Sequence, residues 1–253
     1  MTYNIKYDNK NDTLNHWDKR KHTLVKLINH YGPSFLGTQE GLLHQIEYMD
    51  MALIDYDFVG VARKDGKKKG EYSALFYNKL QFSPIKSGTF WLSSSPDEPS
   101  VGWDAALERI CSYGLFEEKR TYKKIWVFNT HFDHVGKNAR ENSVALILKK
   151  IKQLNTQNYP VLLIGDFNLQ PNETPIIHLM TQMDDGLKNS KSPFYGPSGT
   201  YNGFQNKPIT RRIDYVFSKG VSVISYEHID DRLASNRHIS DHLPVFMTFK
   251  NLE

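Results

Sequence analysis

The stretch LLIGDFNLQP, residues 162–171, decides how the rest of this 253-residue chain can be interpreted. Together with Val161, its first half is a short apolar run of the kind found in buried strands. The run ends on Asp166, and Asn168 lies two positions later, on the same side of an extended chain. A carboxylate at the end of a buried strand is costly unless it is paired or binds a metal. Taken alone, a plain turn explains these residues better, because Asp and Asn favour strand ends and Pro171 stops the strand.

A second apolar strand ends in a similar way. In SFLGTQE, residues 34–40, the carboxylate of Glu40 follows the strand and is a hard oxygen ligand of the kind that Mg²⁺ prefers. The alternative is a helix-end charge, because a helix is expected to begin near Leu42 and favours an acid at its N-terminus. In isolation that alternative is again the better one.

A histidine ends a third strand. In FNTHFDH, residues 128–134, His131 closes a run rich in aromatic and β-branched side chains. There it could donate a hydrogen bond to a phosphoryl oxygen or protonate a leaving group. A histidine that is only hydrogen-bonded in place is the more common case, and we expect Asp133 and His134 only to shape the loop.

An aspartate and a histidine near the C-terminus form a candidate pair. Asp214 interrupts the apolar strand RRIDYVF, and His242 follows Asp241 directly before the final strand. A buried aspartate needs a partner, and His242 is a natural one. Asp214 would then fix the tautomer of the His242 imidazole and raise its basicity. An Asp–His pair with a purely structural role is equally common.

The spacing of these strand ends predicts a duplicated architecture. One strand ends near Asn4 and the next at Glu40, 36 residues later, while another ends at His131 and the next at Asp166, 35 residues later. A helical stretch lies within each interval, at residues 16–31 and 138–156, as a crossover between parallel strands requires. We therefore expect two sheets packed face to face, with helices outside and the polar strand ends at one rim.

Composition limits the class of protein. The chain is 39% hydrophobic and 24% charged, which is ordinary for a soluble globular protein. Its net charge of +4 fits a phosphate-bearing substrate but is too small to identify a nucleic-acid partner. Cys111 is its one cysteine, which excludes an internal disulfide, and no apolar run approaches the roughly 18 residues of a membrane helix. No targeting segment is present, but a leader trimmed before Met1 would leave no trace, so localisation stays open.

Three loops bear on the substrate. RKDGKKKGE, residues 63–71, favours a solvated hairpin tip over a phosphate clamp. The aromatic and proline-containing segments 88–110 and 193–204 could wall a pocket, although packing of both tryptophans of the first segment against the sheet is slightly favoured.

Taken together, the motifs TYN, TQE, NTHFDH, GDFN, RRIDYVF and SDH resemble, in this order, the signatures of the endonuclease/exonuclease/phosphatase superfamily, which has the DNase I-like fold. The resemblance runs from residue 2 to about 249. It implies a single domain over residues 1–253, of the α/β class, in which two packed mixed β-sheets flanked by helices form a four-layer sandwich. It also implies hydrolysis of a phosphate ester with Mg²⁺ or Mn²⁺.

The resemblance carries a role to each matched residue. Glu40 would be the principal metal ligand, and Asn4 and Asp241 would position the metal directly or through water. Asp166 and Asn168 would orient the attacking water and the phosphate. His131 would stabilise the transition state and, with Asn168, bind the phosphate. His242, held by Asp214, would be a base or a charge stabiliser. Arg109 lies where relatives can carry a phosphate-contacting arginine, and its alternative is a salt bridge with Glu108 or Glu117.

The sequence leaves the substrate open. The expected partner is a phosphate ester, either a small molecule or a single-stranded nucleic acid, and we expect a monomer with no membrane segment. One alternative is a nuclease acting on DNA or RNA, for which a basic groove would be needed. Another is a catalytically inactive binding module with the same fold, although none of the matched positions is substituted.

Overall fold

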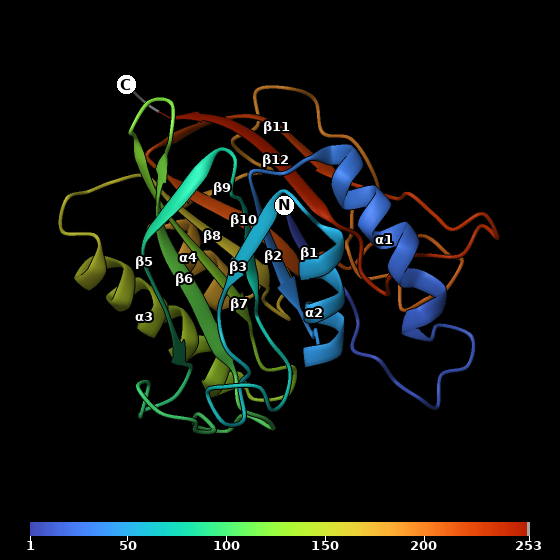
Figure 1. The fold of residues 1–253 in the computed structure, drawn as a ribbon. Helices are drawn as coiled ribbons and strands as arrows, with labels where there is room; N and C mark the ends of the chain where they lie inside the picture. The colour runs from blue at the N-terminus through green and yellow to red at the C-terminus, as the bar shows by residue number, and fades with distance from the viewer. Residues whose placement is uncertain (252–253) are drawn as a thin grey trace.

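The computed structural model describes residues 1–251 and contains two six-stranded mixed sheets packed against each other (Figure 1). The first sheet has the order β11 (Val221–His228), β12 (Val245–Asn251), β1 (Thr2–Asn4), β2 (Phe35–Gln39), β4 (Leu75–Asn78) and β3 (Tyr56–Val59). The second has the order β5 (Phe82–Trp91), β6 (Ile110–Glu118), β7 (Lys124–His131), β8 (Val161–Asp166), β10 (Asp214–Lys219) and β9 (Asp184–Asp185).

Helices cover the outer face of each sheet, which confirms the predicted four-layer sandwich. Helices α1 (Trp17–Tyr31) and α2 (Leu43–Ala52) share a buried apolar cluster with the first sheet. Helices α3 (Lys137–Leu154) and α4 (Thr174–Met180) share another with the second sheet. A third cluster fills the space between the sheets. Figure 1 shows α1 and α2 on one side of the molecule and α3 on the other.

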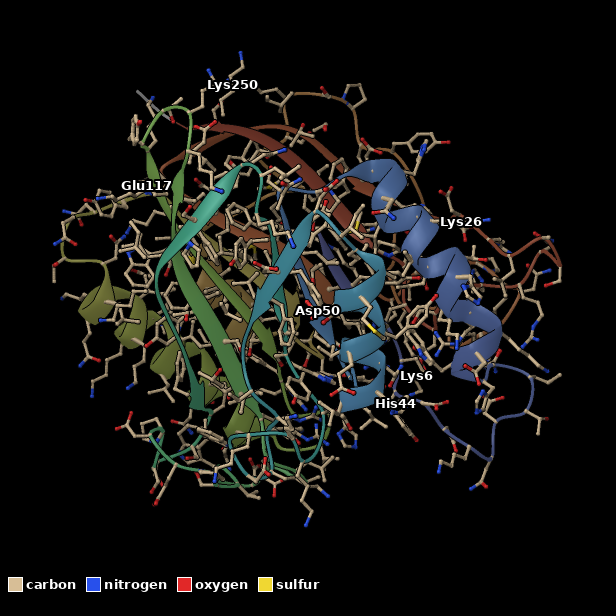
Figure 2. All side chains as sticks on the ribbon, viewed as in Figure 1. Lys6, Lys26, His44, Asp50, Glu117 and Lys250 are labelled. Atoms are coloured by element: carbon tan, nitrogen blue, oxygen red, sulfur yellow. The ribbon has the colours of Figure 1, made fainter. Side chains whose placement is uncertain are left out.

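Central strands have both faces buried, which explains their continuous apolar sequences. In β8, Val161 and Leu163 point to the layer of α3 and α4, whereas Leu162 and Ile164 point between the sheets. Alternate residues of a strand face opposite sides, so a strand covered on both sides must be apolar throughout. The outer surface is polar in contrast, and Figure 2 shows Lys26 of α1 extending away from the fold.

The duplicated crossover units form as the sequence predicts. Strands β1 and β2 are parallel neighbours at the centre of the first sheet, and β7 and β8 are parallel neighbours in the second. The expected helices 16–31 and 138–156 are α1 and α3. Helix α4 and the two-residue strand β9 were not predicted, because both are shorter than the periodicity signal needs.

A buried amide joins the two sheets beneath their common rim. Asn129 on β7 donates from Nδ2 to the carbonyl oxygens of Thr38 and Ala74, at 3.0 and 2.8 Å, in the opposite sheet. Its Oδ1 accepts from Nε2 of Gln39 at 2.7 Å. A fully satisfied polar group inside an apolar layer fixes the relative position of the sheets, because any shift would break several hydrogen bonds.

No helix in the described residues is long and apolar enough to cross a membrane.

Candidate active site

Strand register aligns three of the predicted residues in the second sheet. His131 pairs with Asp166 across β7 and β8, and Asp214 pairs with Asp166 across β10 and β8. Directly paired residues point to the same face of a sheet. In the first sheet, Asn4 pairs with Gln39, so Glu40 extends one residue beyond the row. Both parallel units therefore present their polar ends at the same rim.

Unusual backbone angles turn the strand ends towards this rim. Glu40 and Asn168 have φ values of 66° and 51°, in the left-handed region that non-glycine residues seldom adopt. Gly165 has φ 150°, and a Cβ there would lie 2.1 Å from the carbonyl oxygen of Thr130. Glycine is therefore required before Asp166. Backbone strain of this kind gathers at functional sites, where surrounding structure maintains it.

Asn4 connects the polar ends of the two sheets. Its Nδ2 donates to Oε1 of Glu40 and to Oδ2 of Asp166, both at 3.0 Å. Its Oδ1 accepts from the backbone N–H of Lys6 at 3.1 Å. Asn4 is fully buried and both ends of its amide are used, so it holds the two carboxylates in place from behind the site.

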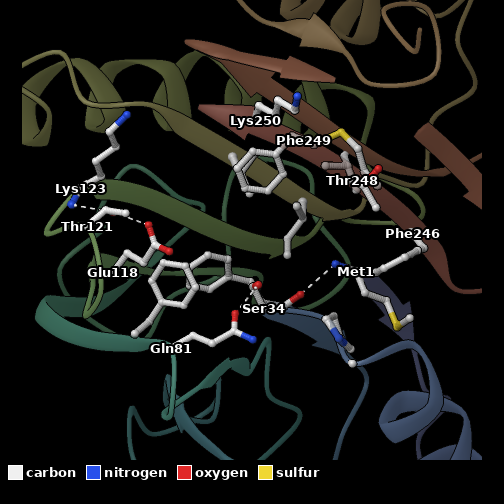
Figure 3. A pocket seen from close by; sticks show the side chains of 18 of the residues that line it. Met1, Ser34, Gln81, Glu118, Thr121, Lys123, Phe246, Thr248, Phe249 and Lys250 are labelled. Atoms are coloured by element: carbon white, nitrogen blue, oxygen red, sulfur yellow. Dashed lines mark hydrogen bonds between the residues drawn. The ribbon is translucent and has the colours of Figure 1, made fainter. Parts of the chain in front are cut away.

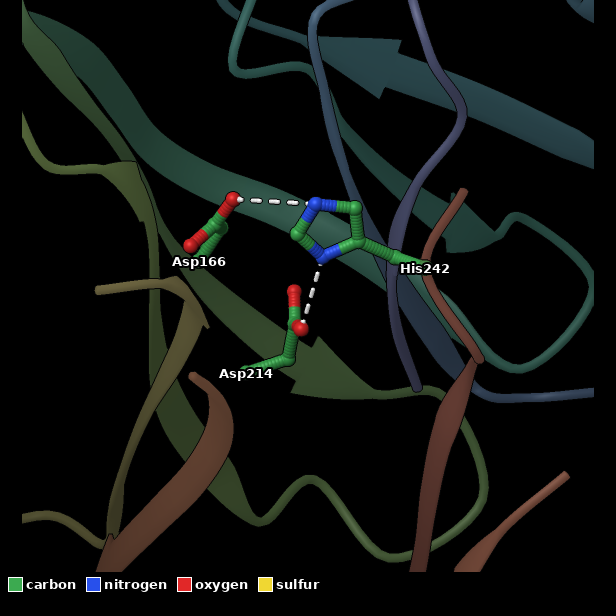
Figure 4. A group of neighbouring side chains, drawn as sticks. All are labelled: Asp166, Asp214 and His242. Carbon is green, nitrogen blue, oxygen red and sulfur yellow. Dashed lines mark hydrogen bonds and ion pairs between the residues drawn. The ribbon is translucent and has the colours of Figure 1, made fainter. Parts of the chain in front are cut away.

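An imidazole lies between two buried carboxylates (Figure 4). Nδ1 of His242 donates to Oδ2 of Asp214 at 2.8 Å, while its Nε2 lies 3.7 Å from Oδ2 of Asp166. Burial alone would lower the pKa of His242, but the Asp214 and Asp166 carboxylates raise it well above its usual value. The predicted Asp214–His242 pair therefore forms, and the two carboxylates favour the protonated form of the imidazole.

Asp166 has an environment suited to taking up a proton. Burial, followed by the nearby Asp214 carboxylate, raises the pKa of Asp166 to about 7. Its Oδ1 accepts from the backbone N–H of Asn168 at 2.9 Å, which fixes the orientation of the carboxylate. A carboxylate with a pKa near neutrality is matched to general-base chemistry at ordinary pH.

His131 and Asn168 lie side by side near Asp166. Nδ2 of Asn168 lies 3.2 Å from Nε2 of His131, and that nitrogen lies 3.5 Å from Oδ2 of Asp166. Burial, then the charges of Arg109 and Arg63, lower the pKa of His131 well below its usual value. His131 is thus a neutral hydrogen-bonding group, which favours contact with a phosphoryl oxygen over protonation of a leaving group.

The carboxylates of Glu40 and Asp241 converge on one positive charge. Nζ of Lys6 lies 3.3 Å from Oε2 of Glu40 and 3.3 Å from Oδ2 of Asp241. Burial would raise the pKa of Glu40, but Lys6 and His242 lower it overall. The two carboxylates therefore point at a place where a cation is favourable, and an oxygen-only donor set of this kind fits Mg²⁺ or Mn²⁺.

A second grouping could also bind a metal ion. Asp166, Asp214 and His242 place ligand atoms within 4.8 Å of one another. Both nitrogens of His242 already face carboxylates, and the raised pKa keeps a proton on the ring. A ligand imidazole must give up the proton at the metal-binding nitrogen. We therefore interpret these three residues as a hydrogen-bonded group that retains a proton, and not as a metal site.

Arg109 is buried, and its charge faces a different partner from those expected. Its Nε lies 3.3 Å from Oδ2 of Asp133, and its Nη2 lies 3.0 Å from Nδ1 of His134. The alternative salt bridge with Glu108 or Glu117 is therefore wrong. Asp133 also accepts from the N–H groups of Val135 and Gly136, so it shapes the loop, as expected, and positions Arg109 too.

A cavity of about 550 Å³ collects these groups. Its walls include the predicted residues Glu40, Arg109, His131, Asp166, Asn168, Asp241 and His242. Asn4 and Asp214 are fully buried beside these residues and act through Glu40, Asp166 and His242. A cavity of about 490 Å³ at the other ends of the strands, near Met1 and Lys250, contains none of the predicted site residues (Figure 3).

Several cavity residues were not predicted: Lys6, Arg63, Glu71, Leu107, Tyr201 and Arg211. The solvated-tip interpretation of residues 63–71 holds for its exposed lysines but is wrong for its two ends, which line the cavity. At the cavity wall, Arg63 forms a two-point ion pair with Glu71. Tyr201 and Leu107 lie in the predicted wall segments 193–204 and 88–110, and Arg211 begins the RRIDYVF motif. No sequence feature pointed to Lys6.

Comparison with known proteins identifies the family of this chain. The model of the Endonuclease/Exonuclease/phosphatase family matches residues 1–242. A family member from Bacteroides thetaiotaomicron has a crystal structure that superposes with a TM-score of 0.95, at 36% identity, covering 100% of this chain and 97% of that one. A mannosyl-6-phosphatase from the same species superposes at 0.94, also at 36% identity, covering 98% and 97%. An uncharacterised protein of Acanthamoeba polyphaga mimivirus is 27% identical and covers 92% of each chain. The chain therefore belongs to the endonuclease/exonuclease/phosphatase family.

Proposed function

We propose that this protein is a divalent-metal-dependent phosphoesterase that hydrolyses a small phosphate ester by attack of an activated water. The observation that carries the proposal is the convergence of six separate segments on one cavity. Four segments line the cavity with Glu40, with His131, with Asp166 and Asn168, and with Asp241 and His242, and the other two place Asn4 and Asp214 directly behind them. Each group suits a separate requirement of phosphate-ester hydrolysis, namely charge neutralisation, a base and a hydrogen-bonding cradle.

Glu40 and Asp241 would hold the metal, with Asn4 keeping Glu40 in place. The place where they converge already accommodates the ammonium of Lys6, which supports the choice of these two carboxylates. A bound Mg²⁺ or Mn²⁺ would supply Lewis-acid stabilisation of charge on the phosphate oxygens.

Asp166 is the proposed base. It would accept a proton from the attacking water, since its pKa lies near 7 and the backbone N–H of Asn168 fixes its orientation. His242 is protonated between two carboxylates, so it would stabilise negative charge and keep Asp166 oriented. Asp214 is a positioning residue that acts through His242.

The other side of the cavity would bind the phosphate. His131 and Asn168 are close enough to contact one phosphoryl group together, and Arg109 adds a fixed positive charge beside them. Preorganised donors at a developing negative charge are commonly the largest contribution to catalysis.

A small substrate is favoured over a nucleic acid. The cavity of about 550 Å³ has the size of a small-molecule site, and the net charge of +4 is modest for a nucleic-acid-binding protein. A relative that is 36% identical over nearly its whole length is a mannosyl-6-phosphatase, which supports a phosphorylated sugar as the kind of substrate to test.

The experiment is a substrate panel with the purified protein: hexose 6-phosphates, p-nitrophenyl phosphate, bis-p-nitrophenyl phosphate and oligonucleotides, in Mn²⁺, Mg²⁺ or EDTA. We expect metal-dependent hydrolysis of the monoesters, abolished by EDTA. Glu40→Gln should lower the rate by roughly 10²–10⁴-fold. The exposed Glu47→Gln is the matched control and should keep the wild-type rate.

Two results would redirect the assignment. Oligonucleotide cleavage far faster than monoester hydrolysis would identify a nuclease. Tight Mn²⁺ binding without hydrolysis of any ester in the panel would favour the inactive binding module.

A further inference from the structure

An ion pair outside the proposed catalytic groups forms part of the cavity wall. Arg63 and Glu71 stand at the two ends of the loop 63–71, and both line the cavity that contains His131 and Asp166. Nη1 and Nη2 of Arg63 donate to the two carboxylate oxygens of Glu71 at 2.8 and 2.9 Å. The mechanism above uses neither residue.

Backbone contacts hold this pair rigidly. The N–H of Arg63 donates to the carbonyl oxygen of Glu71 at 3.0 Å, and Nε1 of Trp91 donates to the carbonyl oxygen of Arg63 at 2.6 Å. The side chain of Arg63 is 6% exposed, whereas that of Glu71 is 19% exposed. The carboxylate of Glu71 is therefore the more accessible half of a fixed planar pair.

The charges near the pair argue against an anionic ligand at this wall. The charge of Arg63 is paired with the carboxylate of Glu71. Burial raises the pKa of Glu71, Arg63 opposes that shift, and the Glu40 carboxylate adds to it. A second phosphate or a carboxylate placed beside Glu71 would therefore meet the negative charges of Glu71 and Glu40, while the Arg63 guanidinium that faces Glu71 is already paired.

An apolar ligand group is also unfavourable here. It would displace water from the pair and form no hydrogen bonds in place of those that the water made. A carboxylate has about four lone-pair positions, and Arg63 occupies one on each oxygen of Glu71. Hydroxyl groups both donate and accept, so they can satisfy the free acceptor positions of Glu71. The side chains of Leu107 and Tyr201 provide a less polar part of the same cavity wall, as the carbon skeleton of a sugar requires.

We propose that the Arg63–Glu71 pair binds hydroxyl groups of a polyol leaving group, so that the substrate is the phosphate monoester of a sugar or a similar polyhydroxy compound. This inference rests on the proposed function, because it assigns the part of the substrate that leaves. Glu71 is a specificity-determining residue, and Arg63 positions it.

The test compares two phosphate monoesters of similar size, a hexose 6-phosphate and cyclohexylmethyl phosphate, which has the ring but no hydroxyl groups. Glu71→Gln should lower kcat/KM for the hexose 6-phosphate by about 10- to 100-fold, since hydrogen bonds to a charged group are lost. We expect the loss mainly in KM and a much smaller loss with cyclohexylmethyl phosphate. Lys68→Ala, an exposed change in the same loop, should leave both substrates unaffected.

The outcomes separate this inference from the proposed function. If the wild-type protein hydrolyses neither ester with metal present, the phosphoesterase assignment is wrong. Hydrolysis by the wild type with equal losses on both esters in Glu71→Gln would overturn the polyol inference alone. Thermal melting of each variant identifies unfolding, and Glu71→Asp, which keeps the charge on a shorter side chain, should recover more hexose 6-phosphate activity than Glu71→Gln.

Discussion

Replacing Asp214 by Asn removes one charge from the buried group Asp214–His242–Asp166 and changes almost nothing in shape. The amide oxygen can still accept from Nδ1 of His242, so the ring orientation is retained. The charge that keeps the imidazole protonated is lost. We expect the pKa of His242 to fall, with a lower hydrolysis rate and lower stability as consequences.

The size of the effect follows from the geometry. At the 2.8 Å separation of Nδ1 and Oδ2, the attraction of unit charges is about 6 kcal/mol at an effective dielectric constant of 20. Desolvation of the buried ions offsets part of it, and removing one partner of a buried pair costs about 3–5 kcal/mol. His242 can shed its proton in the variant, so we expect the lower end, about 3 kcal/mol of unfolding free energy. The rate should fall by about 10²–10⁴-fold.

The pH dependence has a definite sign. The folded-state pKa of His242 lies well above its ordinary value of about 6.5, so the pair stabilises the fold fully below pH 6.5. That stability is lost only as the pH rises through the folded pKa. In Asp214→Asn the stability difference from wild type should therefore be largest at pH 6 and should shrink at higher pH.

Proton NMR of the histidine Cε1–H resonances measures the titration directly, and His242→Asn assigns the signal. The wild-type resonance should keep its protonated shift beyond pH 7, while the Asp214→Asn resonance should titrate at lower pH. The same titration in both proteins would refute the reasoning, because it would mean that Asp214 does not control the protonation of His242.

Three further predictions concern the metal site, acid stability and the contact between the sheets. Lys6→Met should tighten Mn²⁺ binding by about tenfold in calorimetric titration, because the ammonium no longer competes for Glu40 and Asp241; unchanged or weaker binding would argue against these ligands. Burial lowers the pKa of His228 to about 4, so this residue should contribute a loss of about 2 kcal/mol between pH 6.5 and 5, and His228→Gln should reduce the wild-type pH slope in urea melts by that amount. Asn129→Leu should cost about 3 kcal/mol in the same assay, about 1 kcal/mol for each of three hydrogen bonds, and a cost below about 0.5 kcal/mol would show that the sheets do not depend on this amide.

The sequence by itself determined the layers of the fold. A strand covered on both faces is apolar over most of its length, and residues 125–128 of β7 and 161–164 of β8 show that pattern. The similar intervals from Asn4 to Glu40 and from His131 to Asp166 predicted two parallel units, both of which form. These features can be predicted from the sequence because periodicity and strand ends are local properties of the chain.

The candidate residues at strand ends were predictable for the same reason. A charge such as Asp166 or Asp214 stands out against a buried strand, since burying it requires compensation. Their gathering in one cavity is a consequence of register and of the parallel pairing, which place both sets of strand ends at one rim. The roles assigned to these residues remain predictions for the experiments above.

Only the tertiary structure decided which loop residues complete the cavity. The run 63–71 has the composition of an exposed tip, and nothing local distinguishes Arg63 and Glu71 from the lysines between them. Their inward position depends on Trp91, which comes from another strand and holds the backbone of Arg63. Arg109 likewise pairs with Asp133 and not with the nearby acids in its own segment. Loop side chains are positioned by contacts between segments distant in sequence, and those contacts exist only once the two sheets have packed.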